Sequence, residues 1–411
     1  SPEGARGAAL ISPEAIAAAL GQFPPTPEQA AVIAAPLTPA LVVAGAGSGK
    51  TETMAGRVVW LVANGLVRRD EVLGLTFTRK AAGELAERIQ RRLSRLGEYE
   101  RRGLLPHLEG LYRTGALDAF ARIEHGEGGV HAAEAARRAA LDALEATVAA
   151  SSSRDATAAD APSRDATAAG APSTGAPRGD GAAAGEAGAA ASDALLHRPT
   201  VATYNSFADQ LVRENAVRIG RDPESVVLSE SAAWLLMRSV VHASDDPALE
   251  EVARRPSTII DAALGLARDA VDNLADLDAV AAFADDLGEV LERPSRRGTG
   301  PLARVRDAVA PVSWLPPLTR LAHEYDAQKR RRGLIDFSDQ VAGALQIVRA
   351  HPSVAAELRG RYRVVLLDEY QDTSVVQSDL LAALFADTAV MAVGDPHQSI
   401  YGWRGASAGN L

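Results

Sequence analysis

Short apolar runs, each bounded by turn or helix signals, recur along the chain. Most of their residues are apolar, without strict alternation, which is typical of strands buried on both faces of a parallel sheet. A helical pattern follows several of them, for example RKAAGELAERIQRRLSRL after the second run. Strand followed by helix, repeated, predicts an α/β fold with helices on both faces of an open sheet. The runs lie at 41–44, 72–78, 200–204, 364–367 and 390–393.

The uneven spacing of these runs predicts two insertions into the sheet domain. The first has a helical part, 93–149, and then a segment, 150–193, built almost wholly of Ala, Gly, Ser, Thr, Pro, Asp and Arg. Within it, SRDATAADAP (153–162) is followed by the near-copy SRDATAAGAP (163–172). With few large apolar side chains, the segment cannot offset the entropy of ordering it. We therefore expect a disordered surface loop, with a functional linker as the alternative.

The second insertion, 221–332, differs in kind because it carries amphipathic helical patterns such as ESAAWLLMRSVVHA and STIIDAALGLARDAVDNLADL. Apolar residues at helical spacing, including a tryptophan, can form a core of their own. This insertion is therefore expected to be a compact helical subdomain. The sheet domain is then assembled from three separate pieces, 1–92, 194–220 and 333–411.

Composition narrows the possible classes of protein. The chain has 411 residues, 47% of them hydrophobic, enough for two or three domains with a sizeable core. The absence of cysteine excludes disulfides, thiolate metal sites and thiol nucleophiles. No apolar run approaches the roughly 20 residues that span a bilayer, so we expect a cytoplasmic protein with no membrane partner. The formal net charge of -10 disfavours a general polyanion-binding surface, although a narrow nucleic-acid groove needs only local basic and aromatic residues.

A glycine-rich turn follows the first apolar run, in LVVAGAGSGKTETMAG (41–56). Its glycines allow backbone N–H groups to point at phosphate oxygens, Lys50 can reach the β- and γ-phosphates, and the Thr51 hydroxyl can bind Mg²⁺. Ala44 stands where the first glycine of the common phosphate-loop pattern would be. A glycine-rich turn without this role is the alternative. The candidates for nucleotide binding are Gly45, Ala46, Gly47, Ser48, Gly49, Lys50 and Thr51.

The segment VVLLDEYQD supplies two adjacent carboxylates at the end of another predicted strand. A phosphate loop needs one carboxylate to hold the metal, here Asp368, and another to activate water, here Glu369. A solvated acidic turn is the alternative. The glutamate favours hydrolysis by a motor-type ATPase over GTPase signalling, and the sequence has no N-K-x-D guanine motif.

A third candidate motif, AVGDPHQSIYGWRGA, follows the last predicted strand. Gln398 can sense the γ-phosphate, and Tyr401 and Trp403 lie within five residues of it. Aromatic side chains beside a phosphate sensor are expected if the state of the nucleotide changes how bases stack on the protein. Core aromatics are the alternative, although only 4% of the residues are aromatic and these two are flanked by glycine and arginine.

The order of these motifs resembles the N-terminal motor half of UvrD/PcrA/Rep-type superfamily 1 DNA helicases, from about residue 23 to the end apart from the two insertions. The resemblance implies a RecA-like domain that uses ATP and Mg²⁺ to act on single-stranded and duplex DNA. The chain is similar to the AdnB-type subunit of actinobacterial helicase-nucleases in the motifs DEYQDTS and TFTRKAA and in its alanine-rich composition. This resemblance implies a second subunit as partner. The motifs are TPEQ (26–29), AGAGSGKT (44–51), LTFTRKAAGEL (75–85), TYNSFA (203–208), LIDFSDQ (334–340), LLDEYQDTS (366–374) and VGDPHQSIYGWRGA (393–406).

The resemblance also implies residue roles. Gln29 would read the adenine edge, while Lys50, Glu369 and Gln398 would be catalytic. Three positions differ from the usual pattern and bear on base preference and nucleotide affinity: Arg79 replaces Asn, Asn205 replaces His, and Glu52 replaces an adenine-stacking Arg. The implied DNA contacts are Thr76, Phe77, Thr78, Lys80, Asn205 and Ser206, with Tyr401 and Trp403 stacking on bases.

The leading hypothesis is an ATP-dependent translocase that moves 3′ to 5′ along single-stranded DNA in repair or recombination, the direction being implied by the family. The family takes catalytic arginines from a second RecA-like domain, and the sequence ends at Leu411, soon after Gln398. We therefore expect half a motor that is poorly active alone; the first residue, Ser1, is consistent with a fragment or processed form. The alternatives are an ATP-binding structural or regulatory subunit without turnover, an RNA helicase, or an ABC-type ATPase, although the ABC signature L-S-G-G-Q is missing.

Overall fold

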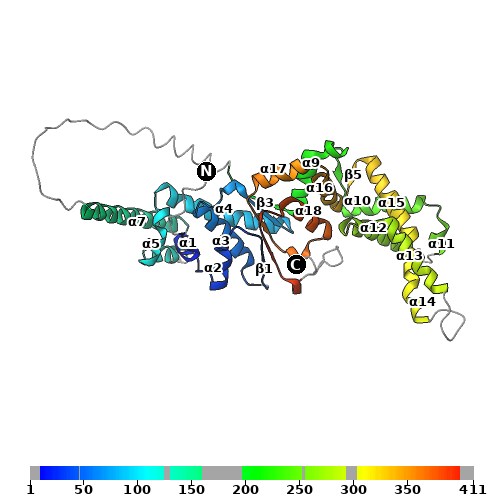
Figure 1. The fold of residues 1–411 in the computed structure, drawn as a ribbon, viewed down its shortest axis with the longest axis horizontal. Helices are drawn as coiled ribbons and strands as arrows, with labels where there is room; N and C mark the ends of the chain where they lie inside the picture. The colour runs from blue at the N-terminus through cyan, green and yellow to red at the C-terminus, as the bar shows by residue number, and fades with distance from the viewer. Residues whose placement is uncertain are drawn as a thin grey trace, which may run out of the picture.

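The five apolar runs form one parallel sheet in the order β1-β7-β6-β2-β3, which confirms the predicted α/β class (Figure 1). The strands are β1 (Ala40–Val43), β2 (Val72–Thr76), β3 (Thr200–Thr203), β6 (Val364–Leu367) and β7 (Ala389–Gly394). Because all five run in the same direction, the loops after them meet at one edge of the sheet. The computed structural model describes residues 10–45, 47–124, 130–159, 197–251, 255–292 and 303–398.

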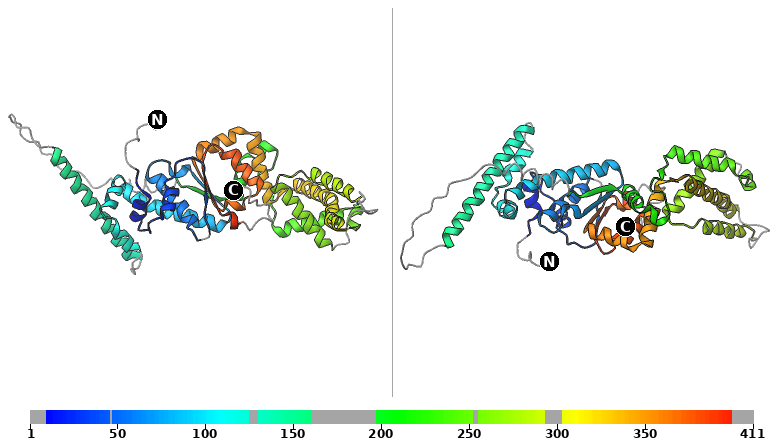
Figure 2. Two further views of the ribbon diagram at one scale, coloured as in Figure 1. Left: turned by 60° about the horizontal axis from the view of Figure 1, so that its bottom comes forward. Right: turned by 90° about the horizontal axis from the view of Figure 1, so that it is seen from above.

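Helices cover both faces of the sheet, and alternate residues of each central strand enter separate cores (Figure 2). In β6, Val364 and Leu366 join the first core, whereas Val365 and Leu367 join the second. The first core is completed by α1 (Pro13–Ala19), α3 (Lys50–Ala63) and α4 (Arg79–Arg101), with α2 (Pro27–Ile33) at its border. The second is completed by α9 (Tyr204–Asn215), α16 (Phe337–Ala350), α17 (Pro352–Arg361) and α18 (Val375–Phe385).

Strand β1 does not fit the expectation of burial on both faces. Leu41 is 49% exposed and Val43 is 62% exposed, whereas every residue of β2 and β6 is buried. The reason is position, because β1 is an edge strand that pairs with β7 only, and the described helices leave the Leu41 side open. An apolar run alone does not distinguish an edge strand from a central one.

The first insertion folds into α5 (Leu108–Arg113), α6 (Asp118–Glu124) and α7 (Val130–Ala159), which extend the first core away from the sheet (Figure 1). Helix α7 corrects the expected boundary at 149, since residues 150–159 continue it instead of starting a disordered loop. Alanine has the highest helix propensity, and adding residues to an existing helix is easier than starting one. The rest of the expected loop, 160–193, lies outside the described residues.

Over its described residues, the second insertion contains six α-helices with a separate core, at the end of the molecule opposite α7 (Figure 1). Its entry and exit are joined by two short parallel strands, β4 (Val226–Val227) and β5 (Leu334–Ile335). Over the described part of the chain, no helix is long and apolar enough to cross a bilayer. The six helices are α10 (Glu230–Ala243), α11 (Pro247–Glu251), α12 (Pro256–Asp272), α13 (Leu277–Glu292), α14 (Ala303–Val309) and α15 (Leu315–Arg332).

A buried charged cluster joins this subdomain to the sheet domain. Lys329 near the end of α15 is 4% exposed, and its Nζ lies 3.2 Å from Asp336 Oδ2 and 2.5 Å from Asp339 Oδ2 at the start of α16. The Tyr325 hydroxyl donates to Asp336 Oδ2 at 2.9 Å. A buried ion pair with its hydrogen bonds satisfied holds the two elements in one arrangement, because separating them would leave unpaired buried charges.

Candidate active site

The glycine-rich turn connects β1 to α3 at the carboxyl edge of the sheet. Gly47 and Gly49 have φ values of 75° and 80°, a left-handed conformation that residues with a Cβ rarely adopt. Gly49 is the N-cap of α3, so Lys50 and Thr51 occupy its first turn, where unpaired backbone N–H groups favour an anion. Gly45 and Ser48 complete the described part of the turn, and Ala46 lies outside it.

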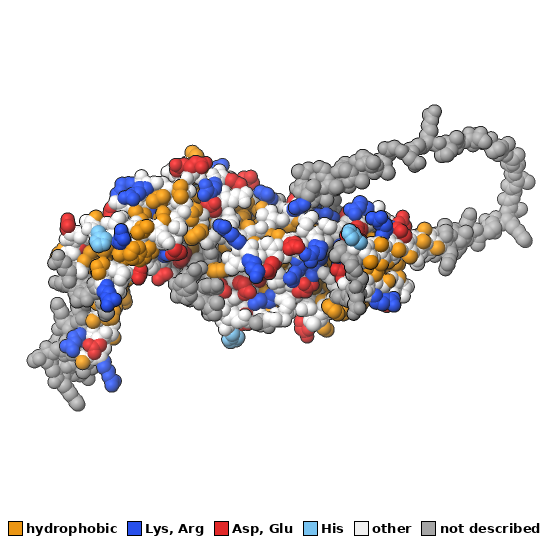
Figure 3. Space-filling model, turned by 180° about the vertical axis from the view of Figure 1, so that it is seen from behind, with side chains coloured by type: hydrophobic (Ala, Val, Ile, Leu, Met, Phe, Trp, Pro, Cys, Tyr) orange, Lys and Arg blue, Asp and Glu red, His pale blue; other side chains and the backbone are white. Residues whose placement is uncertain are grey.

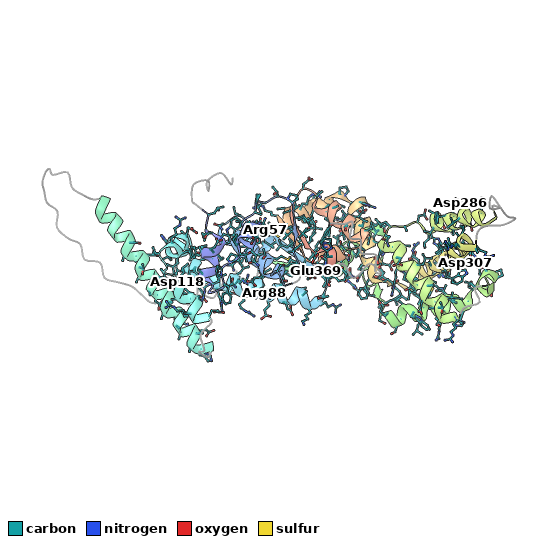
Figure 4. The ribbon with its side chains drawn as sticks, turned by 90° about the horizontal axis from the view of Figure 1, so that it is seen from below. Arg57, Arg88, Asp118, Asp286, Asp307 and Glu369 are labelled. Atoms are coloured by element: carbon teal, nitrogen blue, oxygen red, sulfur yellow. The ribbon has the colours of Figure 1, made fainter. Side chains whose placement is uncertain are left out.

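The two adjacent carboxylates follow β6, and Glu369, labelled in Figure 4, contacts the first residue of α3 after this turn. Asp368 is 5% exposed, and burial, followed by the charge of Glu369, raises the pKa of its carboxyl to about 6. Glu369 has a left-handed backbone with φ of 49°, which is uncommon for a residue with a side chain. Its Oε2 lies 3.4 Å from Lys50 Nζ, so residues 319 positions apart in the chain meet at the turn.

Gln371 connects the carboxylates to the loop after β7, and the sequence analysis did not single it out. Gln371 is 1% exposed; its Nε2 donates to Glu369 Oε2 at 2.8 Å, and its Oε1 accepts from the backbone N of Asp395 at 2.9 Å. Asp395 in turn accepts a hydrogen bond from the Gln398 amide. The sensor candidate Gln398 is thus linked to the water-activating candidate Glu369 through two residues, Asp395 and Gln371. Gln371 lies in DEYQD and Asp395 lies in VGDPHQ, and both motifs were noted in the sequence. Their place in these motifs could have indicated a role in the site.

Gln29 lies against the glycine-rich turn from the other side. Its Oε1 accepts from Thr26 N at 3.0 Å in the capping box of α2, and its Nε2 donates to Ser48 O at 2.9 Å. A Cβ at Gly49 would come within 2.8 Å of that Nε2, so only glycine allows this approach. Beside Gln29 is a cavity of about 490 Å³ whose lining includes apolar side chains and four arginines of α4, a mixed surface that suits a planar base.

Glu52 stands where the family resemblance implied an arginine, and it pairs with arginines of the neighbouring helix α4. Arg88 Nη1 lies 3.1 Å from Glu52 Oε2, and Arg92 donates to Glu52 Oε1. The Arg92 side chain is 7% exposed, and burial lowers the pKa of its guanidinium while Glu52 opposes that shift. The arginines that line the cavity beside Gln29 therefore all come from α4, and Arg88 is labelled in Figure 4.

The expected nucleic-acid contacts after β2 are only partly exposed. Thr76 is 0% exposed because it ends a strand between β3 and β6, so its side chain is covered here and its contact with DNA stays a prediction. Phe77 is half-buried against the second core. Thr78 caps α4 by accepting from Ala81 N at 3.1 Å, and the Lys80 side chain is 87% exposed. This segment thus offers two exposed cations, Arg79 and Lys80.

The contacts expected after β3 lie at the start of α9. Asn205 is half-buried and its Oδ1 accepts from Gln377 Nε2 of α18 at 3.1 Å, while Ser206 is exposed. Near them the sequence analysis missed Phe337, the first residue of α16, which is 45% exposed although α16 packs along α9. Its place in LIDFSDQ was the available signal. The remaining candidates, Tyr401 and Trp403, lie outside the described residues.

Charge on the molecular surface is mixed. On the face drawn in Figure 3, lysine and arginine side chains are interspersed with aspartate and glutamate and form no continuous basic patch. A nucleic acid held by this face would depend on a few local contacts instead of a broad positive field. This distribution is consistent with the net charge of -10.

Comparison with known proteins gives the family. A model of the UvrD/REP helicase N-terminal domain matches residues 25–411. ATP-dependent DNA helicase UvrD2 of Mycobacterium tuberculosis (strain H37Rv) is 24% identical over 389 residues, which cover 92% of this chain and 37% of that protein. DNA helicase II of Haemophilus influenzae is 21% identical over 380 residues, covering 92% of this chain and 34% of that protein. DNA helicase II of Escherichia coli (strain K12) is 42% identical over 82 residues, 20% of this chain and 11% of that protein.

The chain thus spans little more than a third of the length of the UvrD2 and Haemophilus relatives that it matches. The matching segment holds the glycine-rich turn, the paired carboxylates and the loop after β7, all of which the structure brings to one edge of the sheet. This chain belongs to the UvrD/REP helicase N-terminal domain family.

Proposed function

We propose that this chain is the ATP-binding half of a motor that couples ATP hydrolysis to movement along single-stranded DNA. The observation that supports the proposal best is the 3.4 Å approach of Glu369 Oε2 to Lys50 Nζ across the mouth of the sheet. It puts a carboxylate beside the place that the first turn of α3 favours for an anion. The ammonium of Lys50 and the carboxylate of Glu369, from distant parts of the sequence, thus both lie at the expected position of the γ-phosphate.

The residues present fit a magnesium ion. Mg²⁺ prefers oxygen ligands, and the Thr51 hydroxyl and the Asp368 carboxylate would hold it together with phosphate oxygens. Burial and the charge of Glu369 raise the pKa of Asp368, and a cation beside this carboxylate would favour its charged form. The ion would supply charge neutralisation on the phosphates.

Each residue then has one task during hydrolysis. Lys50 offsets negative charge on the β- and γ-phosphates, and Glu369 accepts a proton from the water that attacks the γ-phosphorus while the bond to ADP breaks. Gln398, oriented by Asp395, contacts the γ-phosphate. Gln29 reads the base.

DNA would bind along the same edge of the sheet, where the loops after β2 and β3 end. Lys80 supplies a charge for the phosphate backbone, Asn205 and Ser206 supply polar contacts, and Phe337 supplies an exposed ring for stacking. Movement from 3′ to 5′, a role in repair or recombination, and a second subunit of a helicase-nuclease assembly are the parts of the proposal that come from family resemblance.

A paired measurement of ATP affinity and phosphate release, made on the complete motor of which this chain is proposed to be half, with and without single-stranded DNA, tests the proposal. Glu369→Gln is expected to leave ATP affinity within about twofold and to slow phosphate release by about a hundredfold or more, because the general base is lost. Glu357→Gln, which changes an exposed glutamate of α17, is the matched control and should alter neither quantity. If the unchanged protein releases phosphate no faster than Glu369→Gln does, the proposed hydrolysis is wrong. The alternative, a regulatory subunit that binds ATP without turnover, would then remain.

The nucleic acid and the direction need their own experiment. The complete motor should unwind a duplex with a 3′ single-stranded tail faster than the same duplex with a 5′ tail. Unlabelled single-stranded DNA should compete for binding better than RNA of the same sequence. The opposite tail preference, or stronger competition by RNA, would overturn that part of the proposal and leave the ATPase assignment intact.

A further inference from the structure

A buried arginine two turns after Lys50 binds the end of the helix that carries Gln29. Arg57 of α3 is 2% exposed (Figure 4), and its guanidinium reaches the carbonyl groups where α2 ends and the following loop begins. Carbonyls at a helix end lack the usual donor four residues further on, and a positive charge is favoured there by the helix dipole. Nη1 donates to Val32 O at 3.1 Å, Ile33 O at 3.1 Å and Ala35 O at 2.8 Å, and Nη2 donates to Pro36 O at 3.0 Å. Two of these carbonyls also accept a backbone hydrogen bond, Val32 O from Ala35 N at 3.3 Å and Pro36 O from Thr38 N at 2.9 Å.

This arrangement is costly for a simple helix cap. Burial lowers the pKa of Arg57, and no charged neighbour among the described residues offsets that shift. Arg359 caps the end of α18 in a less costly way, because its side chain remains partly exposed to water. It donates to Ala383 O at 3.4 Å and to Leu384 O at 2.9 Å. A guanidinium that stays charged without a carboxylate partner is stabilised by the full set of carbonyl groups. Arg57 therefore depends on the end of α2 staying in one position.

The position of α2 decides where the Gln29 amide lies. Gln29 is one helical turn before Ile33, the last residue of α2, so a shift of the capped end moves the amide with it. The same end of α2 also packs against α3 at Gly56, where a Cβ would lie 3.0 Å from Ile33 Cδ1. Helices α2 and α3 thus approach as closely as a glycine allows, next to the buried arginine.

We propose that Arg57 is a positioning residue for base selection. By holding the end of α2 against α3, it keeps the Gln29 amide where it can accept from the amino group and donate to the N7 of adenine. Guanine presents a carbonyl oxygen in place of that amino group and is rejected. The inference rests on the proposed function, because Gln29 selects a base only if the neighbouring turn binds a nucleotide.

The test measures dissociation constants of ATP, GTP and inorganic tripolyphosphate by displacement of a fluorescent ATP analogue. Arg57→Lys keeps the charge but cannot reach four carbonyls, so it should lower the preference for ATP over GTP by about tenfold, the value of one misplaced hydrogen bond. Tripolyphosphate has no base, and its affinity should stay within about twofold. In a Gln29→Ala background, Arg57→Lys should leave the remaining preference unchanged, because the residue through which it acts is gone.

Arg359→Lys is the matched control, since it removes the same kind of cap from α18 and should lower stability without changing base preference. If Arg57→Lys does not fold, Gly56→Ala provides the test, because it displaces Ile33 and should also reduce the preference for ATP. Equal losses of ATP and tripolyphosphate affinity, or an unchanged ATP-to-GTP ratio in a folded variant, would overturn the inference. Absence of both ATP and tripolyphosphate binding in the unchanged protein would instead overturn the proposed function.

Discussion

The buried hydroxyl of Tyr204 donates a hydrogen bond to the backbone oxygen of Asp368 at 2.9 Å. Tyr204 immediately precedes Asn205 and Ser206, which lie on the expected DNA side, whereas Asp368 is the expected ligand of the metal. Burial raises the pKa of Tyr204 well above its ordinary value, so the hydroxyl remains a neutral donor. One hydrogen bond therefore connects the two sides of the site without an intervening residue.

Tyr204→Phe should weaken the coupling between nucleotide and DNA. Loss of the hydrogen bond leaves the Asp368 oxygen without this donor, which should lower the free energy of unfolding by about 1 to 2 kcal/mol. The change in DNA affinity caused by Mg²⁺ and ATP should shrink as well. Denaturant unfolding and DNA titrations with and without nucleotide measure both effects.

Tyr362→Phe is the control for that variant. Tyr362 lies in the same core and its hydroxyl donates to Thr200 Oγ1 at 3.3 Å, away from both carboxylates. It should lower stability and leave the coupling unchanged. Equal effects of the two variants on coupling would show that Tyr204 acts through stability alone.

Lys50→Ala should lower the affinity for ATP by about ten- to a hundredfold, since it removes a charge-assisted contact to the phosphates. The Lys50 side chain is 10% exposed, so water replaces it poorly. Isothermal titration with Mg²⁺ and ATP measures the loss. Lys80→Ala removes the same charge from an exposed position and should bind ATP normally; unchanged affinity in Lys50→Ala would contradict the assigned role.

Lys80→Ala should instead change DNA binding. Removing one phosphate contact reduces the slope of log affinity against log salt by about 0.7 for a single strand. Binding measured by fluorescence anisotropy at several salt concentrations gives this slope. Arg349→Ala, at the far end of α16 from Phe337, removes an exposed charge that pairs with Asp379 and should leave the slope unchanged. A slope that both variants reduce equally would indicate a general charge effect.

Asp272→Asn should stabilise the protein at neutral and alkaline pH. Burial raises the pKa of Asp272 to about 6, from an ordinary value of 3.8, while a hydrogen bond from Ser338 partly opposes the shift. Between these values the folded state keeps a proton that the unfolded chain releases, so the cost of the charge is absent below about pH 4 and complete above about pH 6. The gain in the free energy of unfolding at pH 8 should be at most about 3 kcal/mol.

Chemical denaturation of both proteins at pH 5 and at pH 8 checks this dependence, with the larger gain expected at pH 8. Asp286→Asn is the control, because it changes an exposed carboxylate of α13 in the same subdomain (Figure 4). A gain that is equal at the two pH values would rule out titration of Asp272 as its cause.

The sequence by itself determined the strands and the elements that carry the site. The runs at 364–367 and 390–393 are strands within two residues of the expected bounds, and the turn before Lys50 has the left-handed glycines that a phosphate loop requires. These features depend on local chemistry, on apolar runs and on residues such as glycine that alone allow certain backbone angles. For the same reason the two adjacent carboxylates could be placed at the end of a strand.

Only the tertiary structure decided which of these residues are accessible and which partners they have. Thr76 and Lys80 belong to one motif, yet one is fully buried and the other is exposed. Arg57 looks like an ordinary helix residue in the sequence, and its role depends on carbonyl groups more than twenty positions away. Burial and pairing result from elements that are distant in sequence, and because a buried charge is stable only with partners, the packing of those elements sets the chemistry of each side chain.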